Sequence, residues 1–271
     1  MAYKAVFIDI DGTFIQSDHT VSRATIAAVQ QLKERGVFVV MVSARPMHGM
    51  QAIIAAADLQ GCPVAALNGA CIAVDDAIVY EASINIEIAA ALYTQLQAYQ
   101  PTLMFYGQQH WFAEQRNKYT DKEQKITSVP LVIQPFGSSL HYWAQQENGL
   151  HKILAVAPAP VVNKMQEAIM SVYGNQLNVA ASKPIYLEIM GSGASKLLAV
   201  QFLMKHFQLL QQEIVCIGDN FNDKEMIAYA GLGIAMGNAP DAVKAAADYT
   251  TATNNNDGVA KAIARFFQLQ D

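Results

Sequence analysis

Residues 37–42 read VFVVMV, an uninterrupted apolar run that is too short to form an amphipathic helix. Such a run indicates a strand covered on both faces, which is typical of a parallel sheet inside an α/β protein. A helix expected over residues 23–35, capped by Ser22 and closed by Gly36, separates this run from a first strand at residues 5–8. Strand, helix and strand at this spacing form one βαβ unit, so the sequence predicts an α/β fold with a Rossmann-like parallel sheet.

The βα alternation is interrupted once along the chain and then resumes. It predicts a core domain made of residues 1–83 and 188–271, into which an α+β cap domain, residues 84–187, is inserted. For the core we further expect strands at 64–67, 71–74, 77–81, 214–217 and 232–235, and helices from Pro46 and over 194–207, 222–230, 240–247 and 258–269. For the insertion we expect helices over 86–99 and 161–173, strands at 103–106, 110–113, 151–157, 177–181 and 185–189, and a polar loop over 118–125.

Composition narrows the classes of partner. The chain has 271 residues, of which 52% are hydrophobic, and a formal net charge of −5 without a run of Lys or Arg. This charge argues against nucleic acid or an anionic membrane as the main partner and favours a small molecule. Three well-separated cysteines, no leader-like N-terminus and no run of 18 apolar residues lead us to expect a soluble, cytoplasmic protein with free thiols. The oligomeric state stays open.

Two carboxylates follow the first strand directly, in the segment D-I-D-G-T at residues 9–13. Side chains repeat every two residues along an extended backbone, so Asp9 and Asp11 are expected on the same side, where they repel unless a cation or a proton lies between them. A solvated turn, in which an Asp side chain caps its own backbone, is the alternative interpretation of a single D-x-D.

A second acidic segment, I-G-D-N-F-N-D at residues 217–223, follows another apolar strand. Asp219 and Asp223 are four residues apart, so a helix beginning here would stack them on one face. Four carboxylates at two strand ends, with no His or Cys nearby, suit a hard cation, Mg²⁺ before Ca²⁺ or Zn²⁺. Taken alone the segment could equally be an N-cap and a turn; its position after a second parallel strand favours the metal site.

Two further polar residues stand where an anion could bind. Ser43 ends the strand at residues 37–42 just before a helix N-terminus, although a plain cap would explain it equally well. Lys196 is expected in the first turn of its helix, at the positive end of the helix dipole, which favours an anionic partner, although a solvated lysine is the commoner explanation of any single case.

In this order, the segments D-I-D-G-T (9–13), Ser43, G-A-S-K (193–196) and G-D-N-F-N-D (218–223) resemble the haloacid dehalogenase superfamily of phosphohydrolases, and specifically its Cof-type branch. The segments N-G-A (68–70), A-M-G-N-A (235–239) and D-G-V-A (257–260) support the resemblance. It covers the whole chain, and the insertion resembles the large α/β (C2-type) cap of that branch. The family more often has Thr-Gly where this chain has Ser43-Ala44, and Leu where it has Phe14.

The resemblance implies a role for each matching residue. Asp9 corresponds to the nucleophile that forms an aspartyl-phosphate, and Asp11 to the general acid and base, which must start protonated. Mg²⁺ would be held by Asp9, the backbone carbonyl of Asp11 and Asp219, with Asp223 orienting the metal shell. The residues implied to hold the phosphoryl oxygens are Ser43, Lys196, Asn222 and the backbone N–H groups of Gly12 and Ala44.

The expected function is therefore a Mg²⁺-dependent phosphatase acting on a small phosphorylated metabolite, with sugar phosphates ahead of pyridoxal or flavin phosphates. A phosphomutase, a phospho-acceptor signalling domain and a catalytically silent metabolite-binding protein are the alternatives. Aromatic and polar residues of the cap could contact the substrate, although cap core or surface is the more typical place for such residues: Tyr106, His110, Trp111, Tyr119 and Trp143.

Overall fold

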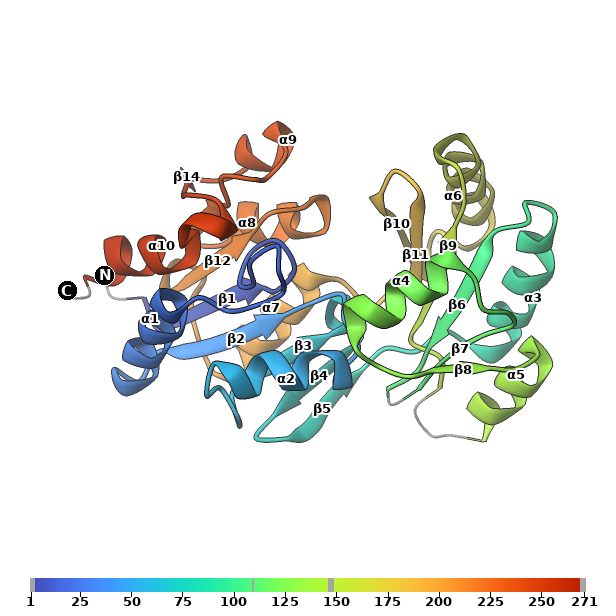
Figure 1. The fold of residues 1–271 in the computed structure, drawn as a ribbon, viewed down its shortest axis with the longest axis horizontal. Helices are drawn as coiled ribbons and strands as arrows, with labels where there is room; N and C mark the ends of the chain where they lie inside the picture. The colour runs from blue at the N-terminus through green and yellow to red at the C-terminus, as the bar shows by residue number, and fades with distance from the viewer. Residues whose placement is uncertain (1–2, 109, 146–148, 269–271) are drawn as a thin grey trace.

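The computed structural model describes residues 3–108, 110–145 and 149–268, and it places them in two sheets with their own helices (Figure 1). The larger sheet belongs to the core and has the strand order β14-β13-β12-β1-β2-β3-β4-β5. Its strands are β1 (Ala5–Asp9), β2 (Phe38–Val42), β3 (Val64–Ala66), β4 (Cys71–Val74), β5 (Ala77–Glu81), β12 (Ile214–Gly218), β13 (Leu232–Ala235) and β14 (Tyr249–Thr250). From β14 to β3 all pairs are parallel, whereas β4 and β5 are antiparallel.

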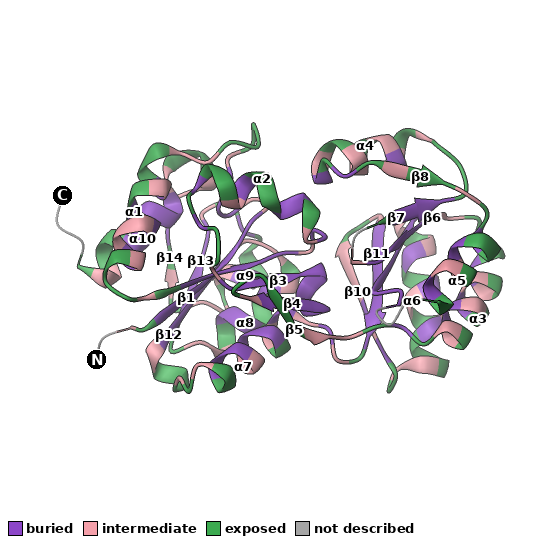
Figure 2. Ribbon diagram, turned by 90° about the horizontal axis from the view of Figure 1, so that it is seen from below, coloured by how far each residue is buried: buried purple, intermediate pink, exposed green. Residues whose placement is uncertain are grey.

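The strand β1 lies at the centre of this sheet, and all five of its residues are buried. Successive side chains alternate between the two faces: Phe7 packs with helices α7 and α8, and Ile8 with helices α1, α2 and α10. The core helices are α1 (Arg23–Glu34), α2 (His48–Ala56), α7 (Lys196–His206), α8 (Lys224–Tyr229), α9 (Asp241–Lys244) and α10 (Gly258–Phe267). The predicted parallel sheet, covered on both faces, is confirmed (Figures 1 and 2).

The second sheet forms the cap, with the strand order β10-β11-β9-β6-β7-β8. Its strands are β6 (Thr102–Tyr106), β7 (Trp111–Ala113), β8 (Leu131–Ile133), β9 (Lys152–Val156), β10 (Leu177–Lys183) and β11 (Tyr186–Gly191). Helices α3 (Ile86–Gln97), α5 (Phe136–Ala144) and α6 (Ala159–Tyr173) cover one face, and the other face turns toward the core beside α4 (Lys118–Thr127) (Figure 2). The expected domain boundary at residue 187 falls inside β11, which pairs with cap strands along its whole length.

The polar loop expected over residues 118–125 is wrong, because this segment is the helix α4. Its low hydrophobicity concealed it, but Asn117 and Thr120 form a capping box that satisfies the free N–H groups of the first turn. The sequence also did not predict β8 and α5. The helix expected over 222–230 begins instead as a 3₁₀ turn, Phe221–Asp223, and the one expected over 240–247 shrinks to α9. The last residue of the helix expected over 258–269 lies outside the described residues.

No helix in the described part of the chain combines the length and the apolar composition that crossing a membrane requires. Cys71 and Cys216 are buried, Cys62 is half-buried, and all three are free thiols.

A buried histidine ties the cap to the core where the chain passes between them. The Nε2 atom of His151 lies 3.1 Å from Glu81 Oε1 at the end of β5, and the nearby residues Ile84 and Leu150 form an isolated bridge. His151 is fully buried, and burial lowers its pKa from 6.5 to about 4. The folded protein therefore holds this imidazole neutral at pH values where the unfolded chain protonates it.

We expect the protein to lose stability between pH 6.5 and pH 4 because of His151. Below pH 6.5 the unfolded chain binds a proton that the folded chain binds only near pH 4, so the free energy of unfolding falls, by up to about 3 kcal/mol. The measurement is urea unfolding of the wild type and of His151→Gln across this range. The difference between the two should shrink as pH falls; a constant difference would contradict the assignment. His141→Gln, at an exposed position, is the matched control.

Candidate active site

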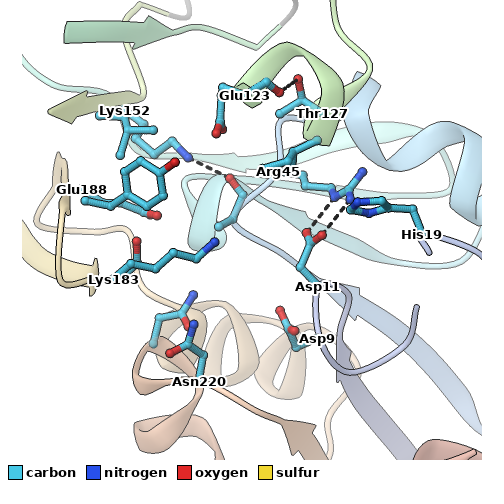
Figure 3. Close-up of a pocket in the computed structure, with 16 residues that line it drawn as sticks. Asp9, Asp11, His19, Arg45, Glu123, Thr127, Lys152, Lys183, Glu188 and Asn220 are labelled. Atoms are coloured by element: carbon cyan, nitrogen blue, oxygen red, sulfur yellow. Dashed lines mark hydrogen bonds and ion pairs between the residues drawn. The ribbon is translucent and has the colours of Figure 1, made fainter. Parts of the chain in front are cut away.

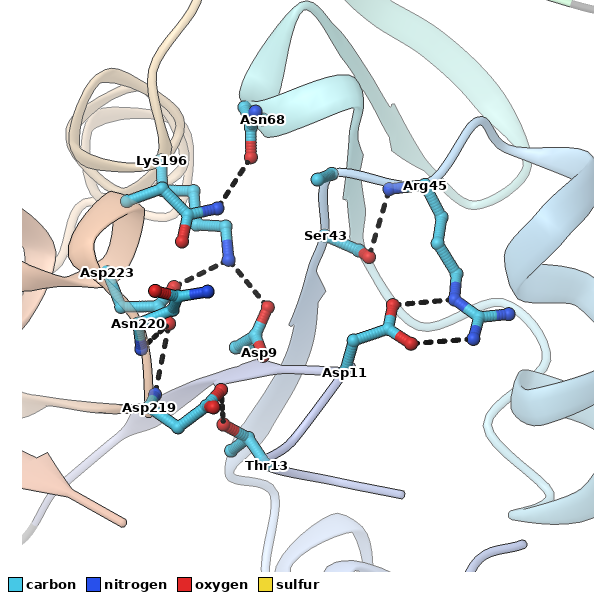
Figure 4. A network of polar contacts seen from close by, with 12 residues as sticks. Asp9, Asp11, Thr13, Ser43, Arg45, Asn68, Lys196, Asp219, Asn220 and Asp223 are labelled. Carbon is cyan, nitrogen blue, oxygen red and sulfur yellow. Dashed lines mark hydrogen bonds and ion pairs between the residues drawn. The ribbon is translucent and has the colours of Figure 1, made fainter. Parts of the chain in front are cut away.

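The carboxyl ends of β1, β2 and β12 meet at one edge of the core sheet, and this edge carries the residues that the sequence singled out (Figure 4). Asp9 is the last residue of β1, Ser43 follows β2, and Asp219 follows β12. Lys196 arrives from a different direction, as the first residue of α7, whose N-cap Ser195 accepts a hydrogen bond from the Leu198 N–H. The parallel topology thus gathers residues that are up to 210 positions apart in sequence.

Lys196 is buried and forms ion pairs with two carboxylates at once. Its Nζ atom lies 2.5 Å from Asp9 Oδ1 and 2.5 Å from Asp223 Oδ1. Burial alone would lower the pKa of Lys196, but the charges of Asp223 and Asp9 outweigh it and raise the pKa above its usual value. The anionic partner that Lys196 needs at a helix N-terminus is therefore a pair of aspartates.

Asp9, Asp219 and Asp223 form a cluster in which one oxygen of each lies within 4.8 Å of the others. Burial, followed by the charge of Asp223, raises the pKa of Asp9 well above its usual value and that of Asp219 to about 6. Among the described residues, no hydrogen-bond partner reaches the buried Asp9 Oδ2. Three carboxylates that face one lysine leave an excess of negative charge, which a hard divalent cation would neutralise.

Asp223 does not stack on Asp219 along a helix, so that part of the prediction is wrong. The helix α8 begins only after Asp223, because Asp223 belongs to the preceding 3₁₀ turn. Its Oδ2 instead accepts the backbone N–H groups of Asp219 and Asn220, at 3.0 and 2.9 Å. Asp223 therefore fixes the shape of the loop that carries Asp219.

Gly12 and Thr13 hold the other side of Asp219. Gly12 has φ +88°, and a Cβ atom there would overlap the Asp219 carboxylate, so only glycine lets the two loops approach this closely. The Thr13 hydroxyl donates to Asp219 Oδ1 at 3.0 Å.

The two carboxylates of the D-x-D segment have different hydrogen-bond partners, although both line one cavity. Asp9 faces Lys196, whereas Asp11 accepts two hydrogen bonds from Arg45, 2.7 Å from Nε and 2.7 Å from the Nη2 atom (Figure 4). The Arg45 backbone N–H donates to Ser43 Oγ at 3.1 Å, and Arg45 Nη1 donates to the Gly49 carbonyl. The two hydrogen bonds make a bidentate pair, the geometry in which a guanidinium matches a carboxylate.

Sequence reasoning did not select Arg45, although its position was informative. It follows Ser43-Ala44 at the end of a buried strand, and therefore at the same edge of the sheet as Asp11. A buried arginine at such a place needs an anionic partner, and the nearest strand end supplies it.

A cavity of about 210 Å³ lies between this edge and the cap (Figure 3). From the core, Asp9, Asp11, Arg45 and Asn222 are among its lining residues. The cap side is polar and carries both charges; its polar lining residues include Glu123, Lys152, Lys183, Tyr186 and Glu188. The cavity therefore opens onto the carboxylate cluster and is walled by two domains.

Two of these cap residues show how the cap wall is arranged. Lys152 Nζ donates to the Ala44 carbonyl at 2.9 Å and lies 4.6 Å from the centre of the Tyr106 ring, so it connects the cap to the loop after β2. The Tyr186 hydroxyl is buried and has no hydrogen-bond partner in the described part of the chain.

The aromatic residues proposed as substrate contacts lie elsewhere. Tyr106 and Trp111 are buried and stack on each other at 5.4 Å, and Trp143 is buried against Phe105 and Phe112 on the helix side of the cap sheet. Within the described residues, the lining of the cavity includes none of the five: Tyr106, His110, Trp111, Tyr119 and Trp143. Tyr106 and Trp111 lie on the sheet face that turns toward the core, where they pack in one cluster with Leu67 and Ala70, so their rings stabilise the contact between cap and core.

Asn222 lies at the boundary between cavity and core, and its Nδ2 donates to Asn68 Oδ1 at 3.1 Å. Asn68 follows β3 and was noted in the sequence only as part of N-G-A. The structure therefore brings together Asp9, Lys196, Asp219 and Asp223, with Ser43, Ala44 and Asn222 around them, and adds Arg45 and Asn68.

A parallel core sheet with an inserted cap, and an aspartate cluster at its carboxyl edge, defines a class of capped α/β hydrolases. Residues 6–263 match the family of haloacid dehalogenase-like hydrolases, and the chain belongs to that family.

Known proteins match along almost the whole chain. A protein of Haemophilus influenzae named "Putative phosphatase" is 32% identical over 263 residues, which cover 96% of this chain and 97% of that one. The 5-amino-6-(5-phospho-D-ribitylamino)uracil phosphatase YitU of Bacillus subtilis is 26% identical, covering 97% of both chains. The crystal structure of a haloacid dehalogenase-like hydrolase from Bacteroides thetaiotaomicron superposes with a TM-score of 0.87 at 28% identity and covers 98% of this chain and 100% of that one. The protein is a phosphatase of this family.

Proposed function

We propose that the protein is a Mg²⁺-dependent phosphatase that hydrolyses a small phosphorylated metabolite, with sugar phosphates as the favoured class, through an aspartyl-phosphate on Asp9. The observation that carries the proposal is the state of the Asp9 carboxylate. Lys196 holds it through Oδ1, while Oδ2 stays unpaired within the described residues, at the edge of a cavity large enough for a small molecule. A fixed carboxylate oxygen without a hydrogen bond is suited to attack phosphorus.

In the first step, an Asp9 oxygen bonds to phosphorus while the bond from phosphorus to the leaving oxygen breaks, and Asp11 gives that oxygen its proton. In the second step, water attacks the phosphorus, Asp11 takes a proton from the water, and the bond from Asp9 to phosphorus breaks. For the first step Asp11 must leave Arg45 and carry a proton, because the guanidinium pairs with the ionised form. Arg45 therefore holds Asp11 in the form that it needs for the second step.

The residues present fit a magnesium ion. The three clustered carboxylates offer only oxygen ligands, and one oxygen of each lies within 4.8 Å of the others. We assign Asp9, the Asp11 backbone carbonyl and Asp219 to the metal, and Asp223 to positioning the Asp219 loop. When bound, the ion neutralises phosphoryl charge and reduces the repulsion between the phosphate and the aspartates.

Other residues of the same edge are assigned to the phosphoryl oxygens. Each offers a positive charge or a hydrogen-bond donor, and they come from four separate segments of the chain: Gly12, Ser43, Ala44, Lys196 and Asn222. Ser43 Oγ already accepts from the Arg45 N–H, so its own proton is available for an anion. Such donors stabilise the negative charge that develops on the phosphoryl oxygens in the transition state.

The cap wall favours a hydroxylated leaving group over a flat aromatic one. Carboxylates, ammonium groups and the unpaired Tyr186 hydroxyl can all hydrogen-bond to hydroxyls. Tyr186 is the one aromatic side chain of the cap among the described lining residues, so a pyridoxal or flavin ring would find little to stack on. The Bacillus relative whose named substrate carries a phosphoribityl chain fits the same preference.

We expect the purified protein to release phosphate from an aryl phosphate in the presence of Mg²⁺ and to lose at least about 100-fold in rate with excess EDTA. Adding Mg²⁺ back should restore the rate, and Mg²⁺ alone should raise the unfolding temperature because it binds the folded site. A rate that EDTA leaves unchanged would contradict the metal assignment.

A panel of phosphorylated metabolites then separates sugar phosphates from ring phosphates, and transfer of phosphate to an acceptor in place of release would indicate a phosphomutase.

A further inference from the structure

Asn68 occupies a backbone turn that only its surroundings can maintain. In the turn Leu67–Gly69 three consecutive residues have positive φ, of 51°, 54° and 87°. Glycine adopts this region freely, but Leu67 and Asn68 do so at a cost. Gly69 is pressed against the backbone of Ser195, because a Cβ there would lie 2.6 Å from the Ser195 carbonyl oxygen. The turn is therefore braced against the start of the helix that carries Lys196.

From this turn, Asn68 connects the cap to the core through its side chain. Its Nδ2 atom donates to Glu188 Oε2 of cap strand β11 at 2.5 Å and to the Met190 sulfur at 3.6 Å. Its Oδ1 atom accepts from Asn222 Nδ2 at 3.1 Å. Asn68 and Glu188 are both more than nine-tenths buried. The NH₂ group of Asn68 therefore contacts the cap, and its carbonyl oxygen contacts the core.

The chemistry of these groups fixes the direction of each hydrogen bond. A carboxylate accepts and does not donate, so Glu188 requires the NH₂ group of Asn68 to face it. The Asn68 oxygen must then face Asn222 and requires the NH₂ group of Asn222 in turn. One N–H of Asn222 is used in this contact, and the second remains for another acceptor. Glu188 and Asn222 line the cavity above Asp9, and with Asn68 they also line a second cavity of about 220 Å³ beside Lys196.

We propose that Asn68 is a positioning residue, and that Glu188 acts through it to hold the Asn222 amide with its N–H toward the phosphoryl group. This inference rests on the proposed function, which assigns Asn222 to the phosphoryl oxygens. It couples the two domains: when the cap is closed, Glu188 sets the Asn222 amide for phosphate, and when it is open, the amide is free to turn its oxygen inward. The cap then controls phosphate binding as well as access to the site.

We call the chain of hydrogen bonds from Glu188 through Asn68 to Asn222 the relay. Exchanging a donor and an acceptor within it tests the proposal. Asn68→Asp places two carboxylates against each other, and we expect the affinity for inorganic phosphate, with Mg²⁺ present, to fall about 100-fold. In N68D/E188Q the new amide at position 188 donates to the new carboxylate at position 68. The carboxylate at position 68 accepts from Asn222 in both variants, so the double variant removes only its repulsion from position 188 and should recover at least about tenfold of the loss. Glu188→Gln alone should cost about threefold, because its amide oxygen can still accept.

The relay is overturned if the double variant binds phosphate no better than N68D. Asn163→Asp with Glu167→Gln, an exposed pair on α6, makes the same exchange away from the site and should change nothing. Should N68D not fold, Glu188→Met replaces it: loss of the acceptor must weaken phosphate binding at least about fivefold relative to E188Q, and equal affinities would overturn the relay.

These variants also separate the relay from the proposed function. A wild type that binds phosphate but releases none from any ester would refute the phosphatase, whereas the order of phosphate affinities would still decide the relay. In an active wild type, the relay predicts a fall in kcat and in phosphate affinity together, which a merely structural contact would not produce.

Discussion

Asp9→Asn is expected to lower the rate of phosphate release by about 10⁴-fold or more. The amide cannot form the acyl phosphate that the carboxylate forms, and it is a weaker ligand for a divalent cation. Removing a nucleophile commonly costs this much because the remaining groups only bind and polarise the substrate. The measurement is phosphate release from an aryl phosphate with Mg²⁺, together with trapping of the phosphorylated enzyme after acid quenching.

The fold should survive this change. Asp9 is a buried carboxylate whose pKa is raised by burial and by Asp223, so neutralising it removes a repulsion. Without metal, Asp9→Asn should therefore unfold at a temperature no lower than that of the wild type. Asp18→Asn, at an exposed position in the turn that follows, is the matched control and should keep full activity. Activity that persists in the purified Asp9→Asn protein would remove Asp9 as the nucleophile.

Lys196→Met is expected to have the largest effect on stability. Lys196 is the cation that lies between Asp9 and Asp223, and both carboxylates are buried. Removing it leaves two buried carboxylates without a neighbouring cation, and breaking such a pair typically costs about 3–5 kcal/mol. Urea unfolding at neutral pH without metal should show this loss, and phosphate release should fall with it.

A second change distinguishes lost charge balance from lost packing. Adding Asp223→Asn to Lys196→Met removes one of the two buried carboxylates that have lost their cation, and it should recover part of the stability. If the loss came from poor packing around the methionine at position 196, the second change would not recover it. Mg²⁺ should also stabilise Lys196→Met more than the wild type, because the cation replaces part of the missing charge. Lys205→Met, exposed on the same helix, is the control for losing a lysine from α7 and should cost little.

The order of strands and helices could be predicted from the sequence wherever local pattern decides it. The run at residues 37–42 and the strand that ends in Asp9 have apolar residues on both faces, so they predicted buried parallel strands correctly. Segments held by contacts from elsewhere were missed. The helix α4 is polar and is stabilised by its cap and by packing on its partly buried face, while β8 is a three-residue strand that pairs with β7.

For the site, the sequence supplied the reactive residue types and their places at strand ends. It did not supply the partners. Arg45 and Asp11 are 34 residues apart, and Glu188 and Asn68 are 120 residues apart, so no spacing rule connects them. The same limit explains why the cap aromatics were candidates: a sequence shows that Trp111 lies in a strand, but not that its ring stacks on Tyr106 and donates its indole N–H to the Val129 carbonyl.

Residue order and the period of a strand were enough to predict the family, the parallel core and the pairing of two aspartate segments. The tertiary structure alone decided the direction of each polar group. Asp9 faces Lys196, Asp11 faces Arg45, and Asn68 faces Glu188. Each direction is set by a charge or a hydrogen-bond donor that only folding brings within about 3 Å, since the energy of such a contact depends on distance and burial and not on separation along the chain.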